Sequence, residues 1–148
     1  MRSFGLERLG QGRALLEGET DVQAVHNKLE TLLGREHAFV DRIYYCPHHP
    51  EKGFDGERVE LKIACECRKP GIGMIQQAAK DLNIDLARSW LIGDSTTDLQ
   101  TAKNAGIKSI LVRTGYAGKD NKYPVQPDHT CATLNEAVAI VQAASRRV

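Results

Sequence analysis

Several segments of the chain place apolar residues at spacings of three and four, which is the spacing of an amphipathic helix. The first predicted helix covers residues 21–33 and ends at Gly34. Further helices are expected over 72–83, 96–105 and 134–144. Thr96 or Thr97 is the expected cap of the helix over 96–105, because a hydroxyl side chain accepts a hydrogen bond from the first helical turn.

Short apolar and β-branched runs lie between these helices and predict strands. They cover residues 40–45, 89–94 and 107–113. The last two runs lack polar alternation, as expected for parallel strands that are covered on both faces. Residues 1–20 keep no period and are interpreted as loop or frayed helix, and 51–64 and 116–130 as polar loops. Helices that alternate with strands predict an α/β fold, a parallel sheet flanked by helices.

The composition narrows the class of protein. The 148 residues are 41% hydrophobic and 26% charged, with 20 basic against 19 acidic side chains and a net charge of +1. This balance excludes a fully disordered chain and disfavours a binder of nucleic acid or of a membrane surface. The length suits one domain over 1–148. Since no apolar run is long enough for a membrane span or a secretory leader, we expect a cytoplasmic protein.

Two short pairs of metal-ligand residues bracket the loop 46–67. Cys46-x-His48 and Cys65-x-Cys67 are separated by sixteen residues, from 49 to 64. Three thiolates and one imidazole are the ligands of a structural zinc site, so we predict Zn²⁺ here. Reduced cysteines without metal, or a disulfide, are the alternatives, and His49 competes with His48 for the fourth position. Cys131 lies far along the chain and is interpreted as a small buried hydrophobe.

A second candidate site follows the apolar strand over 89–94. Asp94 and Asp98 lie four residues apart at the start of a helix, and two carboxylates at this spacing can share Mg²⁺. The helix N-terminus also favours a phosphate at this place. The alternative for Asp98 is that it only caps the helix. Arg68 and Lys69 precede another helix and are candidate phosphate-binding cations.

Four motifs occur in a distinctive order: IYYCPHHP, CECRKPGIGM, WLIGDSTTD and LVRTG. Together they resemble the HAD superfamily, and within it the zinc-containing branch of D-glycero-D-manno-heptose 1,7-bisphosphate phosphatases and histidinol phosphatases. The resemblance covers residues 38–148 and leaves 1–37 poorly matched. It implies a Rossmann-type parallel sheet with a zinc-pinned loop, apparently incomplete at its N-terminal side.

The resemblance also implies roles for individual residues. Zinc would be bound by the two Cys/His pairs, and Lys69 would hold the nucleophile and the transferring phosphoryl group. Arg68 would contact the sugar or a second phosphate. Asp94 would bind the catalytic Mg²⁺, with Asp98 supporting it. Ser95 stands where some members carry a lysine, beside the expected phosphate.

One expected motif is missing. The family's chemistry starts from a strand that ends in Asp-x-Asp, and no Asp-x-Asp occurs in the chain. The Thr or Ser motif that grips the phosphate is also not recognisable before residue 38. The missing strand would lie in the middle of the sheet, where unpaired backbone groups would cost about 1–3 kcal/mol each. We therefore expect a fragment of a longer product, or another segment or partner chain that completes the sheet.

The sequence favours a Mg²⁺-dependent phosphatase that acts on a sugar bisphosphate. The implied reaction removes the 7-phosphate of D-glycero-D-manno-heptose 1,7-bisphosphate through a phospho-aspartyl intermediate, and histidinol phosphate is the alternative substrate. A second hypothesis is a non-catalytic or truncated domain that binds zinc and a phosphorylated ligand. A third is a small zinc-binding interaction module that is indifferent to Mg²⁺ and phosphate.

Overall fold

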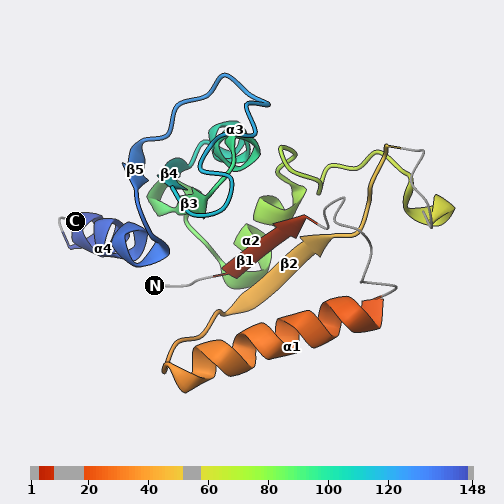
Figure 1. Cartoon of the computed structure of the whole chain (residues 1–148), viewed down its shortest axis with the longest axis horizontal. Coiled ribbons are helices and arrows are strands. Elements are labelled where there is room, and N and C mark those ends of the chain that lie inside the picture. Colours follow the sequence, from red (N-terminus) through yellow and green to blue (C-terminus); the bar gives the residue numbers. More distant parts are fainter. Residues whose placement is uncertain (1–3, 9–18, 52–57, 147–148) are drawn as a thin grey trace. The chain divides into compact units, whose positions relative to one another are not determined.

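The computed structural model describes residues 4–8, 19–51 and 58–146. The chain divides into two compact units, Met1–Arg68 and Lys69–Val148 (Figure 1). The two units are described separately below, and a single domain over 1–148 stays a prediction. No helix among the described residues is long and apolar enough to cross a membrane.

The unit Met1–Arg68 contains a pair of parallel strands and one long helix. In order these are β1 (Phe4–Arg8), α1 (Glu19–Arg35) and β2 (Arg42–Cys46), followed by a single 3₁₀ turn, η1 (Val59–Leu61). β1 pairs with β2 from Phe4 opposite Arg42 to Arg8 opposite Cys46. The interpretation of residues 1–20 as loop or frayed helix is therefore wrong for β1. A strand that is formed by pairing with residues far along the chain leaves no local period to detect.

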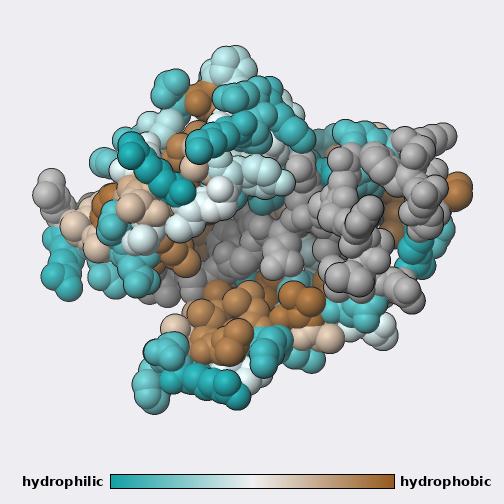
Figure 2. Space-filling model, viewed as in Figure 1, coloured by the Kyte–Doolittle hydropathy of each residue, from teal (hydrophilic) through white to brown (hydrophobic). Residues whose placement is uncertain are grey.

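The helix α1 lies alongside the two strands of its own unit (Figure 1). The His26 ring meets the Tyr45 ring of β2 edge-on, with 5.7 Å between the ring centroids. Val22 and His26 are buried on this side of the helix. Other apolar residues of the same helix remain partly exposed, and Figure 2 shows apolar surface in the region of α1.

The unit Lys69–Val148 is built on a three-stranded parallel sheet with the order β3-β4-β5. Its strands are β3 (Trp90–Gly93), β4 (Lys108–Val112) and β5 (His129–Cys131). Its helices are α2 (Gly73–Leu82), α3 (Thr96–Ala105) and α4 (Leu134–Ser145), with one 3₁₀ turn, η2 (Leu86–Arg88). The predicted loop over 116–130 ends in β5, because three residues are too few to show a strand pattern.

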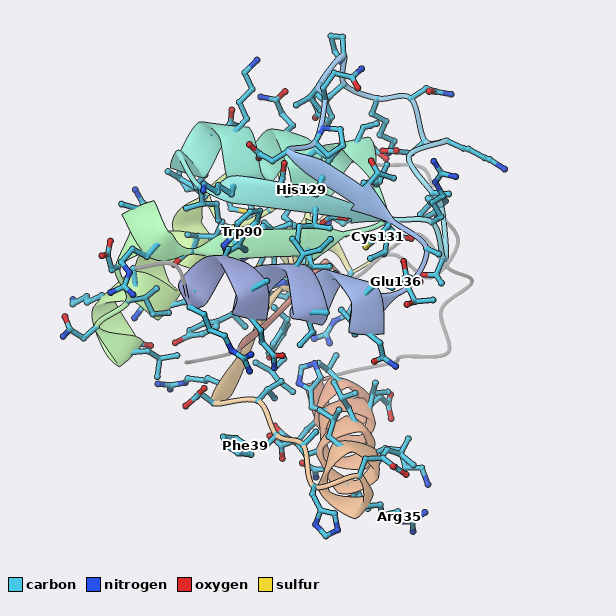
Figure 3. All side chains as sticks on the ribbon, turned by 90° about the vertical axis from the view of Figure 1, so that its left-hand side faces the viewer. Arg35, Phe39, Trp90, His129, Cys131 and Glu136 are labelled. Carbon is cyan, nitrogen blue, oxygen red and sulfur yellow. The ribbon has the colours of Figure 1, made fainter. Side chains whose placement is uncertain are left out.

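One buried apolar cluster of this unit lies between β4 and α4. It consists of Ile110, Val112, Ala137 and Val141, with Trp90, Ile92, Cys131 and Ile140 packed against it. Figure 3 shows α4 along one face of the sheet, and α3 covers the other face. The predicted parallel sheet flanked by helices is confirmed, and all four predicted helices form within two residues of their expected bounds.

The strands of the two units form two separate sheets. In the described residues β3 pairs with β4 alone, although its sequence Trp-Leu-Ile-Gly is typical of an interior strand. The resemblance placed a further strand next to the one that ends at Asp94. That further strand stays a prediction.

Candidate metal centre and active site

The predicted zinc ligands meet in one cluster within the unit Met1–Arg68. Cys46 is the last residue of β2, and the segment after η1 brings Cys65 and Cys67 back to it. One ligand atom each from Cys46, His48, Cys65 and Cys67 lies within 4.8 Å of all the others. The structure uses His48 rather than His49 in this group.

The spacing of the sulfur atoms fits a tetrahedral ion. The Sγ atom of Cys67 lies 3.1 Å from that of Cys46 and 3.3 Å from that of Cys65, and Cys46 and Cys65 are 3.5 Å apart. A tetrahedron with metal–sulfur bonds of about 2.3 Å has sulfur–sulfur edges of about 3.8 Å, only slightly longer. His48 Nδ1 completes the group at 3.4 Å from the sulfur of Cys67. The cluster can therefore hold a metal ion.

The three thiols have unequal proton affinities. Burial, together with hydrogen bonds to the other two thiols, raises the pKa of Cys67 to about 12. Burial also raises the pKa of Cys46. At Cys65 burial acts in the same direction, but hydrogen bonds from Cys67, from the Arg68 backbone and from Cys46 outweigh it and lower the pKa to about 7.

The neighbours of the cluster hold its loop in place. Arg68 donates from Nη1 to the carbonyl of His48 at 2.6 Å, and the amide of His49 donates to the carbonyl of Leu61 at 2.9 Å. Arg68 therefore contacts the metal loop, while its predicted contact with the substrate stays a prediction. Cys131 lies outside the cluster, half-buried, and donates to the carbonyl of Thr133.

The second candidate site lies at the carboxyl end of β3. Ser95 is the N-cap of α3, and with Asp98 it forms a capping box, in which each side chain accepts a hydrogen bond from the other's backbone amide. The prediction of Thr96 or Thr97 as cap is therefore wrong by one or two residues. Gly93 makes room for this arrangement, since a Cβ atom there would lie 2.4 Å from that of Asp98.

Asp98 also forms the ion pair of this site. Its Oδ1 accepts from Lys69 Nζ at 2.7 Å, and the two side chains are 9% and 13% exposed. The carboxylate thus caps the helix and fixes the lysine, while its predicted part in Mg²⁺ binding stays a prediction. An ion pair this well buried and hydrogen-bonded is held far more firmly than a surface pair. The ammonium group of Lys69 is thereby held near the first turn of α3.

Asp94 is oriented by the backbone of the segment after β4. Its Oδ2 accepts from the amide of Tyr116 at 2.8 Å, and its carbonyl accepts from the amide of Gly118 at 2.8 Å. No hydrogen bond to Oδ1 is found among the described residues. That oxygen is therefore available to a cation.

Asp120 belongs to the same region, although no sequence pattern pointed to it. Its carboxylate accepts from the amide of Thr96 at 2.7 Å and from the Thr96 hydroxyl at 2.8 Å, and more weakly from the amide of Thr97 at 3.4 Å. Burial raises the pKa of Asp120, but these hydrogen bonds outweigh it, so the pKa is lowered. The helix N-terminus expected to attract a phosphate is thus already occupied by this carboxylate.

Known proteins match the region that contains these residues. A family model described as HAD-hydrolase-like matches residues 66–137. The D-glycero-beta-D-manno-heptose-1,7-bisphosphate 7-phosphatase of Haemophilus ducreyi is 53% identical over 79 residues, which are 53% of this chain and 41% of that protein. A D-glycero-D-manno-heptose-1,7-bisphosphate 7-phosphatase of Chlorobaculum tepidum is 35% identical over 125 residues, covering 80% of this chain and 61% of that protein.

A solved structure is similar as well. The D,D-heptose 1,7-bisphosphate phosphatase from B. bronchiseptica, complexed with magnesium and phosphate, matches with a TM-score of 0.66 and 30% identity. The match covers 88% of this chain and 66% of that one. The chain spans about half the length of the curated relatives that it matches, with 41%, 39% and 47% of three bacterial 7-phosphatases covered.

Proposed function

We propose that the chain is a member of the HAD-like hydrolases, whose family model matches residues 66–137, and that it carries the phosphate-stabilising part of a Mg²⁺-dependent sugar-bisphosphate phosphatase. The reaction is removal of the 7-phosphate from D-glycero-D-manno-heptose 1,7-bisphosphate. The observation that carries the proposal is the buried Lys69–Asp98 pair beside Asp94, at the end of β3. In open α/β sheets, ligands bind beyond the carboxyl ends of the strands, which is where these groups lie.

Each residue of this site has a role that its geometry suits. Asp94 would hold Mg²⁺ through Oδ1, and the bound ion would neutralise charge on the phosphoryl group. Lys69 would present its ammonium group to the same phosphoryl oxygens, with Asp98 keeping it in place. Ser95 would lie beside the phosphate, and Arg68 would contact the sugar or the second phosphate.

The nucleophile is the part of the reaction that this sequence lacks. In the proposed reaction an aspartate oxygen attacks phosphorus as the phosphorus–oxygen bond to the sugar breaks, and a second aspartic acid gives the leaving oxygen its proton. Water then hydrolyses the aspartyl phosphate. We propose that a strand with Asp-x-Asp, from another segment or a partner chain, pairs with β3 on the side away from β4. The interior-type sequence of β3 supports this placement.

The Cys/His cluster would hold Zn²⁺ in a structural role. Three thiolates and an imidazole form a closed set of soft ligands, and zinc favours four of these in a tetrahedron. The zinc would tie the end of β2 to Cys65 and Cys67 and so shape the loop between them. A cytoplasmic location is part of this proposal, since such thiols are kept reduced there.

Phosphate release tests the proposal. The zinc-loaded chain would be assayed with Mg²⁺ and heptose 1,7-bisphosphate, alone and extended by a segment that carries Asp-x-Asp. We expect release from the extended version and at least about a 100-fold loss in Asp94→Asn, in line with the loss of one group that stabilises charge. Asp128→Asn is the matched control, because it changes a carboxylate that directly precedes β5 and accepts from the amide of Ser109 in β4. An inactive extended version would contradict the proposal.

A second candidate function is binding of a phosphorylated sugar without hydrolysis. It is favoured by the lack of Asp-x-Asp in the 148 residues. Saturable binding of the bisphosphate, with no phosphate release from the extended version, would support it over the phosphatase. Histidinol phosphate in the same assay would separate the two substrates that the family resemblance leaves open.

A further inference from the structure

We propose that Asp120 is a positioning residue for Asp94. Together with Thr96 it fastens the segment 115–123 to the first turn of α3, so that the amide of Tyr116 holds the Asp94 carboxylate in one orientation. The consequence for Mg²⁺ rests on the proposed function. The attachment of the segment itself rests only on hydrogen bonds within the unit Lys69–Val148.

The first attachment of the segment is at Asp94. The amides of Tyr116 and Gly118 donate to the side chain and the carbonyl of Asp94, both at 2.8 Å. Gly115 allows this close approach, because a Cβ atom there would lie 2.0 Å from Asp94 Oδ2. Gly115 also has a φ of +64°, which side chains other than glycine rarely adopt. The Asp94 carboxylate therefore lies directly against the backbone of the segment.

The second attachment is at Thr96, two residues after Asp94 and at the start of α3. The Thr96 hydroxyl donates to Asp120 at 2.8 Å and accepts from the amides of Lys122 and Tyr123 at 3.0 and 3.2 Å. Asp120 in turn accepts from the Thr96 amide at 2.7 Å. Thr96 is 7% exposed and Asp120 is half-buried, so these hydrogen bonds are partly shielded from water. Removing a partner from such a network leaves the remaining groups unsatisfied.

The two attachments are coupled because the chain between them is short. Tyr116 and Gly118 bind Asp94, and Asp120 binds the helix only two residues later. The amide of Lys119 closes a turn onto the carbonyl of Tyr116 at 2.9 Å, which leaves little slack between the two points. Loss of the Asp120 hydrogen bonds should therefore weaken the hydrogen bonds from the amides of Tyr116 and Gly118 to Asp94. The Oδ1 atom of Asp94 would then lose its fixed direction.

Amide hydrogen exchange of the chain, measured by NMR, tests the fastening directly. We expect Asp120→Asn to speed exchange at Tyr116 and Gly118 about two- to fivefold, which corresponds to a weakening by about 0.5–1 kcal/mol. Asp120→Glu should restore part of the protection. Asp128→Asn is the matched control, because Asp128 accepts from the amide and hydroxyl of Ser109 in the same manner, at 2.8 and 3.2 Å. It should leave Tyr116 and Gly118 protected.

Substitution of Thr96, the hydrogen-bond partner of Asp120, tests the same set of hydrogen bonds. Thr96→Val keeps the shape of the side chain but removes the hydroxyl, so it should speed exchange at the same two amides. Thr96→Ser keeps the hydroxyl and should not. Unchanged exchange at Tyr116 and Gly118 in Asp120→Asn would overturn the proposal. Equal acceleration over the whole unit, including β4, would overturn it too, since it would show only a general loss of stability.

A titration with Mg²⁺ connects the fastening to the site. In the unsubstituted chain, Mg²⁺ should shift the amide signals of residues 94–98 and 116–118, and Asp120→Asn should weaken binding about two- to fivefold. In an active, extended version, Asp120→Asn should raise the Mg²⁺ concentration needed for half the maximal rate and leave the rate at saturating Mg²⁺ nearly unchanged. If Mg²⁺ shifts no signal in any version, the proposed function fails, and amide exchange alone decides whether Asp120 orients Asp94.

Discussion

The two units of the chain are stabilised in different ways. In the unit Lys69–Val148 the side chains of Ile75, Leu99 and Ile110 are at most 1% exposed. In the described part of the unit Met1–Arg68, α1 leaves three apolar residues 36–47% exposed: Val25, Leu29 and Leu32. The unit Lys69–Val148 thus has a packed apolar core, whereas the described part of the unit Met1–Arg68 buries few apolar side chains.

The polar contacts differ in the same way. In the unit Lys69–Val148, α3 and α4 begin at the capping residues Ser95 and Thr133, and α2 and α3 end at left-handed residues, Asn83 and Gly106. In the described part of the unit Met1–Arg68, the Cys/His cluster links the end of β2 to Cys65 and Cys67. A unit with a small core needs such a link, because a bound metal ion can provide the stability that burial does not.

Removal of the metal should have the largest effect and should act on one unit only. Structural zinc sites contribute about 10 kcal/mol or more, so a strong chelator or Cys67→Ser should disorder the loop after β2. We expect fast amide exchange over 42–46 and 58–67, with slow exchange retained in β3 and β4. The measurement is hydrogen exchange together with the zinc content of the protein.

Cys131→Ser is the matched control for this prediction. Cys131 is a cysteine outside the cluster, so its replacement should leave one zinc per chain and the same exchange pattern. Equal loss of protection in both units after chelation would contradict the comparison. So would a chain that binds no zinc and keeps the loop ordered.

A cavity in the packed core should have the next largest effect. Leu99 of α3 is 1% exposed, and Leu→Ala at such sites costs about 2–5 kcal/mol. Val138 of α4 is 39% exposed, so Val138→Ala should cost less than about 1 kcal/mol. Urea unfolding followed through Trp90, the only tryptophan of the chain, reports on this unit. Similar losses in the two variants would show that the core is not the main source of stability.

The same contrast explains what the sequence predicted. The helices were predicted from a local period and the three strands from local apolar runs. The four metal ligands were predicted because their types and spacing are specific. β1 and β5 were missed, since a five-residue and a three-residue strand exist only through pairing with distant partners. Asp120 was missed for a related reason. It contacts Thr96 across 24 positions, and a single aspartate in a polar loop has no distinguishing pattern.

Two glycine substitutions should change stability in opposite directions. Gly115→Ala places a side chain on a residue with a φ of +64° and directly against Asp94, so we expect a loss of about 1–3 kcal/mol. Gly34→Ala lies in α1, where nothing is within 4 Å of the added Cβ atom. It should gain up to about 1 kcal/mol, because alanine favours a helix over glycine. Urea unfolding of each unit, followed by amide signals, measures both.

The smallest expected effect is the pH dependence that Asp120 adds to the unit Lys69–Val148. Its pKa is lowered in the folded state from the ordinary value of 3.8, so the unfolded chain binds the proton more readily. The stability that this carboxylate contributes is therefore present above pH 3.8 and is lost as the pH falls through the folded-state pKa. At pH 7 we expect Asp120→Asn to cost about 0.5–1 kcal/mol, the usual value of a carboxylate at a helix N-terminus.

Urea unfolding followed through Trp90 at a series of pH values should show that the stabilities of the two proteins converge in acid. A difference that stays constant down to pH values well below 3.8 would mean that the carboxylate charge contributes nothing, and that Asp120 acts only through the hydrogen bonds that an amide can also accept.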